Sequence, residues 1–195
     1  MPQGPRERLI TSAIALMCER GVHATGVSDL LAHSNTARGS IYQHFPAGKS
    51  ELMEQATLSA GRFMSRKITG LLEFHTPDEA LVALADYWIT TLQSSDFASG
   101  CPIQAAAQSG PSEPAIQAAA AAVFNDWCDQ ITTALTTANV PIDDAFALAS
   151  LAISSIEGAI TQSRAARSTQ PLENVKSALT PTIRRSLRAE PITVR

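Results

Sequence analysis

The spacing of apolar residues is the feature of this sequence that most restricts its fold. Between breaks that contain Gly or Pro, apolar residues recur at intervals of three, four and seven positions, as in Leu81, Leu84 and Trp88. This is the period of an amphipathic helix. No stretch alternates β-branched and polar residues, and no Asn-Gly or Asp-Gly pair marks a hairpin. The sequence therefore predicts an all-α fold of about nine helices and no sheet.

One helix start is marked with particular clarity. In "HTPDEALVAL" we expect Thr76 at the N-cap, Pro77 at the first helical position and Glu79 three residues after the cap. Proline is tolerated there because the first helical N–H has no partner within the helix, and Glu at the third position can accept from the N-cap N–H. We therefore predict a helix that begins at Pro77.

The composition limits the class of protein. It is 45% hydrophobic and 17% charged, which is typical of a folded chain. We find no uninterrupted run of 18 or more apolar residues, so we expect neither a transmembrane span nor a membrane partner. The three cysteines, Cys18, Cys101 and Cys128, are odd in number and far apart. This favours a cytoplasmic location over a disulfide framework.

Charge is distributed unevenly along the chain. Residues 1–70 hold eight Lys or Arg and five Asp or Glu, whereas residues 71–163 hold eleven acidic residues and no Lys or Arg. Residues 164–195 are again basic, with seven Lys or Arg and two Glu. A formal net charge of −3 therefore conceals a basic first third, and it is local charge that meets a polyanion.

Residues 27–45 have the pattern of two short helices joined by a tight turn, "VSDLLAHS", "NT" and "ARGSIYQHF". Asn35 suits the corner because Asn tolerates a left-handed backbone. The expected inner face consists of Val27, Leu30, Leu31, Ile41 and Phe45. Arg38, Ser40, Gln43 and His44 would then point outward, where a recognition helix meets DNA, and Thr25, Tyr42 and Lys49 suit phosphate oxygens. Two short helices with a few solvated charges also occur in many other helical proteins, so spacing alone leaves both interpretations open.

The stretch "GVHATGVSDLLAHSNTARGSIYQHFPAGKSEL" resembles the DNA-binding domain of the TetR family of bacterial regulators. The matching positions are Gly21, Thr25, Gly39, Ser40, Tyr42, His44, Phe45 and Lys49, and the resemblance covers about residues 6–55. One extra residue in "FPAGKSEL", with "SGCPIQAA" at 99–106, resembles the LmrA-like branch. Asn35 and Thr36 depart from the family's usual Gly and small apolar residue. The resemblance implies that Thr25, Tyr42, His44 and Lys49 contact phosphates, and that Arg38, Ser40 and Gln43, with Gly39 beside them, lie nearest the bases.

The resemblance also implies a division of the chain. We expect a helix-turn-helix domain at 1–48, a helical body for ligand binding and dimerisation at 49–190, and a C-terminal tail at 191–195. In the body we expect a cavity partly lined by Phe63, Trp88, Cys101, Phe124 and Trp127, although core packing is the alternative for these side chains. Because residues 71–163 lack Lys and Arg, a neutral or cationic, apolar or aromatic effector fits better than an anion.

The small residues of "ALASLAISSIEGAI" would let this helix approach another closely, so we expect a homodimer formed through the last two helices, about 141–188. The expected function is a repressor that a small effector releases from a palindromic DNA operator. One alternative is a constitutive DNA-binding regulator without a physiological ligand, and another is a helical carrier or enzyme. No catalytic set, phosphate loop or metal-ligand spacing occurs in the sequence, so we expect no enzyme activity, cofactor or metal site.

Overall fold

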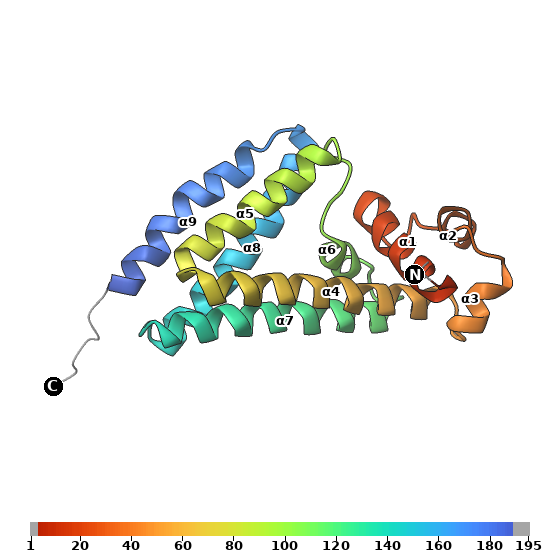
Figure 1. The fold of residues 1–195 in the computed structure, drawn as a ribbon, viewed down its shortest axis with the longest axis horizontal. Coiled ribbons are helices and arrows are strands. Elements are labelled where there is room, and N and C mark those ends of the chain that lie inside the picture. The colour runs from red at the N-terminus through yellow and green to blue at the C-terminus, as the bar shows by residue number, and fades with distance from the viewer. Residues whose placement is uncertain (1–3, 189–195) are drawn as a thin grey trace. The chain divides into compact units, whose positions relative to one another are not determined.

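The computed structural model describes residues 4–188, and this range holds nine helices and no strand, which confirms the all-α prediction (Figure 1). The helices are α1 (Pro5–Arg20), α2 (Val27–Ser34), α3 (Gly39–His44), α4 (Lys49–Phe74), α5 (Pro77–Ser94), α6 (Pro102–Ala107), α7 (Pro114–Thr137), α8 (Ile142–Ala166) and α9 (Gln170–Arg188). The expected tail at 191–195 lies outside the described residues.

By their contacts the helices form two compact units. The first comprises the chain up to Phe63 together with Ala98–Val123, and the second comprises Met64–Phe97 together with the chain from Phe124 onward. The long helices α4 and α7 each contribute to both units. The first unit therefore contains more than the helices expected at 1–48, since α6 and parts of α4 and α7 belong to it.

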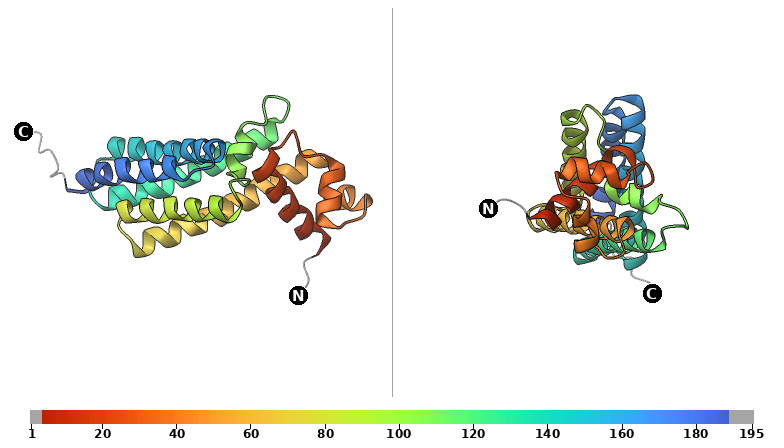
Figure 2. Two further views of the ribbon diagram at one scale, coloured as in Figure 1. Left: turned by 90° about the horizontal axis from the view of Figure 1, so that it is seen from above. Right: turned by 90° about the vertical axis from the view of Figure 1, so that its right-hand side faces the viewer.

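The first unit is built around α1, which packs against α2, α3 and α6. Figure 2 shows α1 beside the two short helices that follow it. Leu9, Leu16 and Leu30 are completely or almost completely buried in this core. Burying an aliphatic side chain of this kind contributes about 1.5–3 kcal/mol. The core thus fixes the two short helices on one side of α1.

In the second unit α9 packs against α5 and α8. The predicted start of α5 is confirmed, because Pro77 is its first residue and Glu79 Oε2 accepts from the Thr76 N–H at 3.1 Å. Polar contacts also tie α9 to α5: the Lys176 ammonium lies 2.5 Å from Asp86 Oδ1.

Length and composition alone would allow α8 to cross a membrane, although polar residues interrupt its apolar stretches. A core helix of a soluble protein meets the same criteria. Ala145, Ala149, Ile156 and Ile160 are buried in the second unit, and acidic Asp143 and Asp144 stand in the first turn of α8. We therefore interpret α8 as a core helix.

Candidate DNA interface and effector cavity

The helix-turn-helix segment has the turn that the sequence predicts. At the start of α2, Asp29 Oδ2 accepts from the Gly26 N–H at 3.0 Å. At its end Asn35 is left-handed, with φ 50° and ψ 52°. The Thr36 N–H then donates to the Leu31 carbonyl at 3.2 Å. This is the hydrogen bond of a Schellman motif, so α2 ends at a defined corner.

Helix α3 is held by two apolar side chains. Ile41 and Phe45 are both fully buried, and the Phe45 N–H donates to the Ile41 carbonyl at 2.7 Å. The guanidinium of Arg6 lies 5.5 Å from the centre of the Phe45 ring, a distance that suits a cation–π contact. Of the expected inner face, Leu30 is also fully buried, whereas Val27 and Leu31 are half-buried.

Most of the residues expected at DNA lie on one exposed segment. Arg38, Gly39, Tyr42 and Gln43 are exposed, and Ser40, His44 and Lys49 are half-buried. Thr25 differs, because it is fully buried and its Oγ1 donates to the Gly21 carbonyl at 2.8 Å. Its hydroxyl is thus engaged in the turn between α1 and α2.

Gly39 is open to its surroundings. It is the first residue of α3, and a Cβ built on it would meet no atom within 4 Å. Its backbone lies in the helix and outside the left-handed region, so neither packing nor backbone conformation within the described protein requires a glycine here. A glycine in such a position allows another backbone to approach closely.

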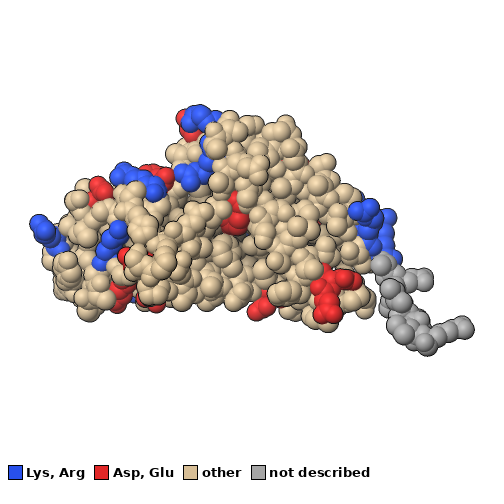
Figure 3. Space-filling view, turned by 180° about the vertical axis from the view of Figure 1, so that it is seen from behind, with Lys and Arg blue, Asp and Glu red and all other residues tan. Residues whose placement is uncertain are grey.

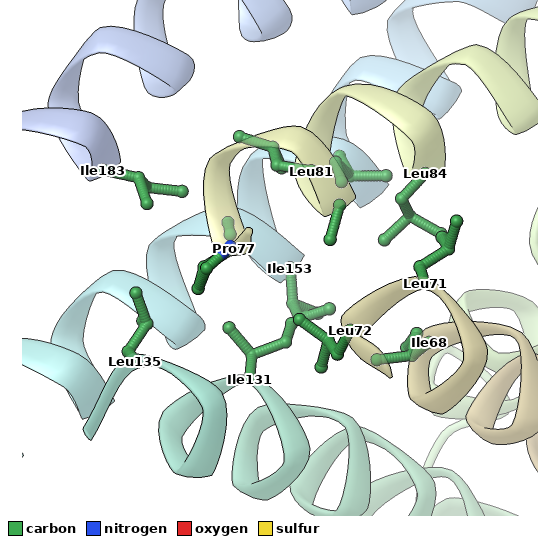
Figure 4. A pocket seen from close by; sticks show the side chains of 13 residues that line it. Ile68, Leu71, Leu72, Pro77, Leu81, Leu84, Ile131, Leu135, Ile153 and Ile183 are labelled. Atoms are coloured by element: carbon green, nitrogen blue, oxygen red, sulfur yellow. The ribbon is translucent and has the colours of Figure 1, made fainter. Parts of the chain in front are cut away.

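A small apolar cavity lies inside the second unit. Figure 4 shows its lining side chains converging from α4, α5, α7, α8 and α9. The lining residues are Ile68, Leu71, Leu72, Pro77, Ala80, Leu81, Leu84, Ile131, Leu135, Ala152, Ile153, Ile156 and Ile183. Its volume of about 30 Å³ has room for roughly two water-sized molecules. The wall carries no charged or aromatic residue.

The five residues expected to line an effector cavity are not in the wall of this one. Phe63 is 52% exposed, whereas Cys101, Trp88 and Trp127 are buried. The Phe124 and Trp127 rings meet edge to face at 5.5 Å. The Trp127 indole N–H also donates to Ser65 Oγ at 3.2 Å.

The two tryptophans lie close to the cavity along their helices. Trp88 follows the lining residue Leu84 by one turn of α5, and Trp127 precedes the lining residue Ile131 by one turn of α7. On α5 and α7, the aliphatic residues that line the cavity lie in the same rows of apolar residues as these tryptophans. Because aliphatic lining residues look like ordinary core positions, the sequence offered no signal beyond those rows.

An ion pair between α5 and α9 flanks the cavity. Asp78 and Arg184 directly follow the lining residues Pro77 and Ile183. Both Nε and Nη2 of Arg184 lie 2.8 Å from Asp78 Oδ2, and Thr76 Oγ1 donates to Asp78 Oδ1 at 2.7 Å. Burial opposes ionisation of the carboxyl, but the hydrogen bonds from Thr76 and Arg184 outweigh burial and hold the pKa of Asp78 below its ordinary value.

The second unit also contains a polar groove and a cysteine, Cys128. A more open groove of about 520 Å³ along α4 and α7 is lined partly by Glu73, His75, Asp126 and Asp129. Within residues 4–188, no group of three or more His, Cys, Asp or Glu side chains could hold a metal ion. Burial, with the nearby Asp129 charge, raises the pKa of the Cys128 thiol, which disfavours a reactive thiolate.

On the face drawn in Figure 3, charged side chains stand in small groups on a mostly uncharged surface.

Two families of known proteins match this chain. Residues 9–56 match the family described as bacterial regulatory proteins, tetR family, and residues 77–178 match the transcriptional regulator LmrA/YxaF-like, C-terminal domain. An uncharacterized HTH-type transcriptional regulator of Mycobacterium tuberculosis is 41% identical over 184 residues, which are 91% of this chain and 93% of that protein. The HTH-type transcriptional regulator LmrA of Bacillus subtilis is 26% identical over 183 residues, covering 92% of this chain and 97% of LmrA.

The fold gives the same assignment. A TetR transcriptional regulator of Chloroflexus aurantiacus is 28% identical and superposes with a TM-score of 0.77, covering 92% of this chain and 94% of that one. The exposed α3 and the turn at Asn35 lie within the matched N-terminal segment, and most of the cavity wall lies within the matched C-terminal segment. The chain belongs to the TetR family of bacterial transcriptional regulators, and its C-terminal domain is of the LmrA/YxaF-like type.

Proposed function

We propose that this regulator is a cytoplasmic homodimeric repressor that leaves a palindromic operator when a small apolar effector enters the second unit. The observation that carries this proposal is the exposed side of α3 together with its N-cap residue. Arg38 and Gln43 are exposed there, and Gly39 leaves space for a DNA backbone. Arg pairs bidentately with guanine and Gln with adenine in the major groove. Tyr42, His44 and Lys49 would contact phosphates, with Ser40 nearer the bases.

Thr25 takes a different place in this proposal. Its hydroxyl donates to the Gly21 carbonyl and its side chain is fully buried. A phosphate contact through that hydroxyl would require the hydrogen bond to break. We therefore assign the Thr25 side chain to the turn that positions α2.

The proposed dimer interface is the outer face of α8 with α9. Leu151 is a large exposed apolar residue of α8, and Gly158 lies seven residues later on the same side of the helix. Ile142 and Phe146 are also exposed, but they lie on another side of α8, near its start. A Cβ at Gly158 would meet no atom within 4 Å, so another helix could approach α8 closely there. Exposed apolar area of this kind is typical of a surface that a second subunit covers. A two-fold dimer would present two recognition helices to half-sites about one DNA turn apart, about 34–36 Å.

For the effector, the aliphatic cavity supports a neutral, apolar molecule. Its wall offers no charged partner, and an unpaired charge inside it would lose its hydration without compensation. At about 30 Å³ the cavity is too small for a drug-sized ligand, so binding must widen it. We propose that it widens towards Trp88 and Trp127, which lie one turn beyond lining residues. The roles of Phe63, Phe124 and Cys101 at such a ligand stay predictions.

Coupling to DNA would pass through α4. Ile68, Leu71 and Leu72 of this helix line the cavity, and Lys49 stands in its first turn. A ligand that displaces the cavity end of a continuous helix also biases its other end. The effector would thus favour one of two arrangements of α4. By linkage, operator binding would lower the affinity of the protein for the effector by the same factor.

The test begins with a duplex selected by the wild-type protein from a random pool. We expect a palindrome, bound with a steep salt dependence. Arg38→Gln should relax base preference within the site, whereas the matched change Arg62→Gln, at another exposed arginine of the first unit, should not. Failure to select any sequence would refute the DNA-binding part of the proposal.

Effector binding is then tested with neutral apolar compounds and with cationic aromatic compounds. The readouts are the fluorescence of Trp88 and Trp127 and the release of DNA. Release by neutral compounds supports the proposed cavity. Selective DNA binding without response to any compound favours the constitutive regulator. Fluorescence changes without DNA binding favour a carrier. Release by cationic compounds alone would contradict the aliphatic site.

A further inference from the structure

The end of α2 leaves backbone carbonyls that its own helix cannot satisfy. Two of them are taken locally, since the Thr36 N–H donates to Leu31 and the Asn35 N–H donates to Ala32, at 3.2 and 3.4 Å. The carbonyls of Ser34 and Asn35 come next, at the corner that leads into α3. The carbonyl end of a helix also carries partial negative charge, which favours a nearby cation.

Arg8 supplies that cation from the first helix of the unit. Its Nε donates to the Ser34 carbonyl at 3.1 Å, and its Nη2 donates to the Asn35 carbonyl at 3.4 Å, near the limit for a hydrogen bond. Two nitrogens of one planar guanidinium thus reach two successive carbonyls. Lysine, with a single terminal nitrogen on a flexible chain, does not offer this fork.

Ile41 and Phe45 hold the middle and the end of α3, whereas the start of the helix depends on the turn before it. The helix has only six residues, and its N-cap residue, Arg38, makes no side-chain capping bond. Within the turn, Ser34 Oγ and Thr36 Oγ1 are 2.7 Å apart. The angle at which α3 leaves the corner therefore depends in part on how firmly residues 34–36 are held, and Arg8 holds them from outside the segment.

We propose that Arg8 is a positioning residue for DNA recognition, which sets the orientation of α3 by capping α2 and makes no contact with DNA itself. This inference rests on the proposed use of α3 as the recognition helix. It separates Arg8 from the other basic residues of the first third of the chain. By charge alone Arg8 would count as a phosphate contact, and the two roles differ in what they predict for salt dependence.

The two roles can be distinguished with Arg8→Ala and Arg8→Lys in the full chain, using the selected duplex and a scrambled duplex of the same length. As a positioning residue, Arg8→Ala should weaken binding to the selected duplex about tenfold, leave the scrambled duplex unaffected and leave the salt slope unchanged. Arg8→Lys should lie between alanine and the wild type. A phosphate contact in each of two subunits would instead lower the slope by about 2 and weaken both duplexes alike. Lys49→Ala, at a proposed phosphate contact, should show this lower salt slope and this weaker binding to both duplexes.

Hydrogen exchange without DNA tests the same role independently. Amides in residues 34–41 should exchange faster in Arg8→Ala, whereas amides of α5 should keep their wild-type rates. Unchanged exchange at 34–41 would overturn the inference, and so would a salt slope reduced by about 2. If the wild type selects no duplex, the proposed function fails, and exchange alone then decides whether Arg8 holds the turn. If Arg8→Ala does not fold, Arg8→Lys, which keeps the side-chain stem, can still be measured.

Discussion

Replacing Asp78 by Asn tests how firmly α9 is held against α5 beside the aliphatic cavity. The Asp78 side chain is 6% exposed, whereas that of Arg184 is 51% exposed. The amide of Asn has one accepting oxygen, while Thr76 and Arg184 both donate to the present carboxylate. Asp78→Asn therefore removes the charge and leaves at least one donor without its acceptor.

The magnitude follows from the unequal exposure of the two partners. Breaking a fully buried ion pair costs about 3–5 kcal/mol, because the remaining charge is left buried. Here the remaining charge is on Arg184, which is half in water, so the loss is closer to that of charge-assisted hydrogen bonds, about 2 kcal/mol. For a chain of 195 residues this corresponds to a Tm lowered by about 4–8 °C.

The measurement is thermal and urea unfolding of wild type and Asp78→Asn between pH 7 and pH 3. Because the folded-state pKa of Asp78 is lowered, its stabilisation is present above the unfolded-state pKa of about 4 and is lost as pH falls through the folded-state pKa. The difference between the two proteins should therefore narrow in acid.

The control for this experiment is Asp96→Asn. Asp96 also pairs with an arginine, with Oδ1 2.6 Å from Nη2 of Arg167, but its side chain is 83% exposed. Removing so exposed a pair should change the free energy of unfolding by less than about 1 kcal/mol. Equal losses for the two variants, or an Asp78→Asn difference that is constant down to pH 3, would refute the assignment of the effect to a buried carboxylate.

Four other changes test the remaining features. Gly39→Ala should keep or slightly raise stability, by up to about 0.5–1 kcal/mol, yet abolish operator binding in a gel-shift assay; unchanged binding would mean that no backbone approaches there. Gly61→Ala places a Cβ 2.3 Å from Val123 Cγ2 and should cost about 1–3 kcal/mol in urea unfolding, with Val123→Ala relieving part of the loss in the double variant. Ala152→Val should raise stability by about 0.5–1 kcal/mol by filling the cavity and abolish effector-induced DNA release; release at wild-type concentrations would place the effector elsewhere. Leu151→Glu should convert the proposed dimer to a monomer, as measured by light scattering, and a dimer that persists would exclude the α8 face.

Much of the fold could be predicted because its signals are local. Pro77 and Glu79 mark the start of α5 whatever the rest of the chain does, and the left-handed Asn35 follows from the short turn between two apolar stripes. The exposure of Gln43 follows from the burial of Ile41 and the period of the helix, because these two residues lie on opposite sides of α3. These inferences need only the neighbours within one or two turns.

The details that the sequence did not predict depend on residues far apart in the chain. Arg8 contributes to the turn 26 residues later, and in the sequence it is only one basic residue among several. Thr25 carries a hydroxyl that suits phosphate, but whether that hydroxyl is free depends on the Gly21 carbonyl beside it in the folded turn. Motif positions indicate which residues take part in recognition, and only the fold separates those that face outward from those that hold the outward residues in place.

The expected chemistry of the effector also depends on which side chains face the cavity and which are held by other residues. The lack of Lys and Arg between residues 71 and 163 admitted both neutral and cationic ligands, and the aromatic residues of this region suggested a site for cations. In the folded unit Trp127 instead packs against Phe124 and donates to Ser65, while aliphatic side chains surround the cavity. A cation entering that wall would meet no ring face and no carboxylate among its lining residues. Among neutral effectors, selectivity at such a site therefore comes from shape and apolar area, so neutral effectors of similar size and shape should compete for it.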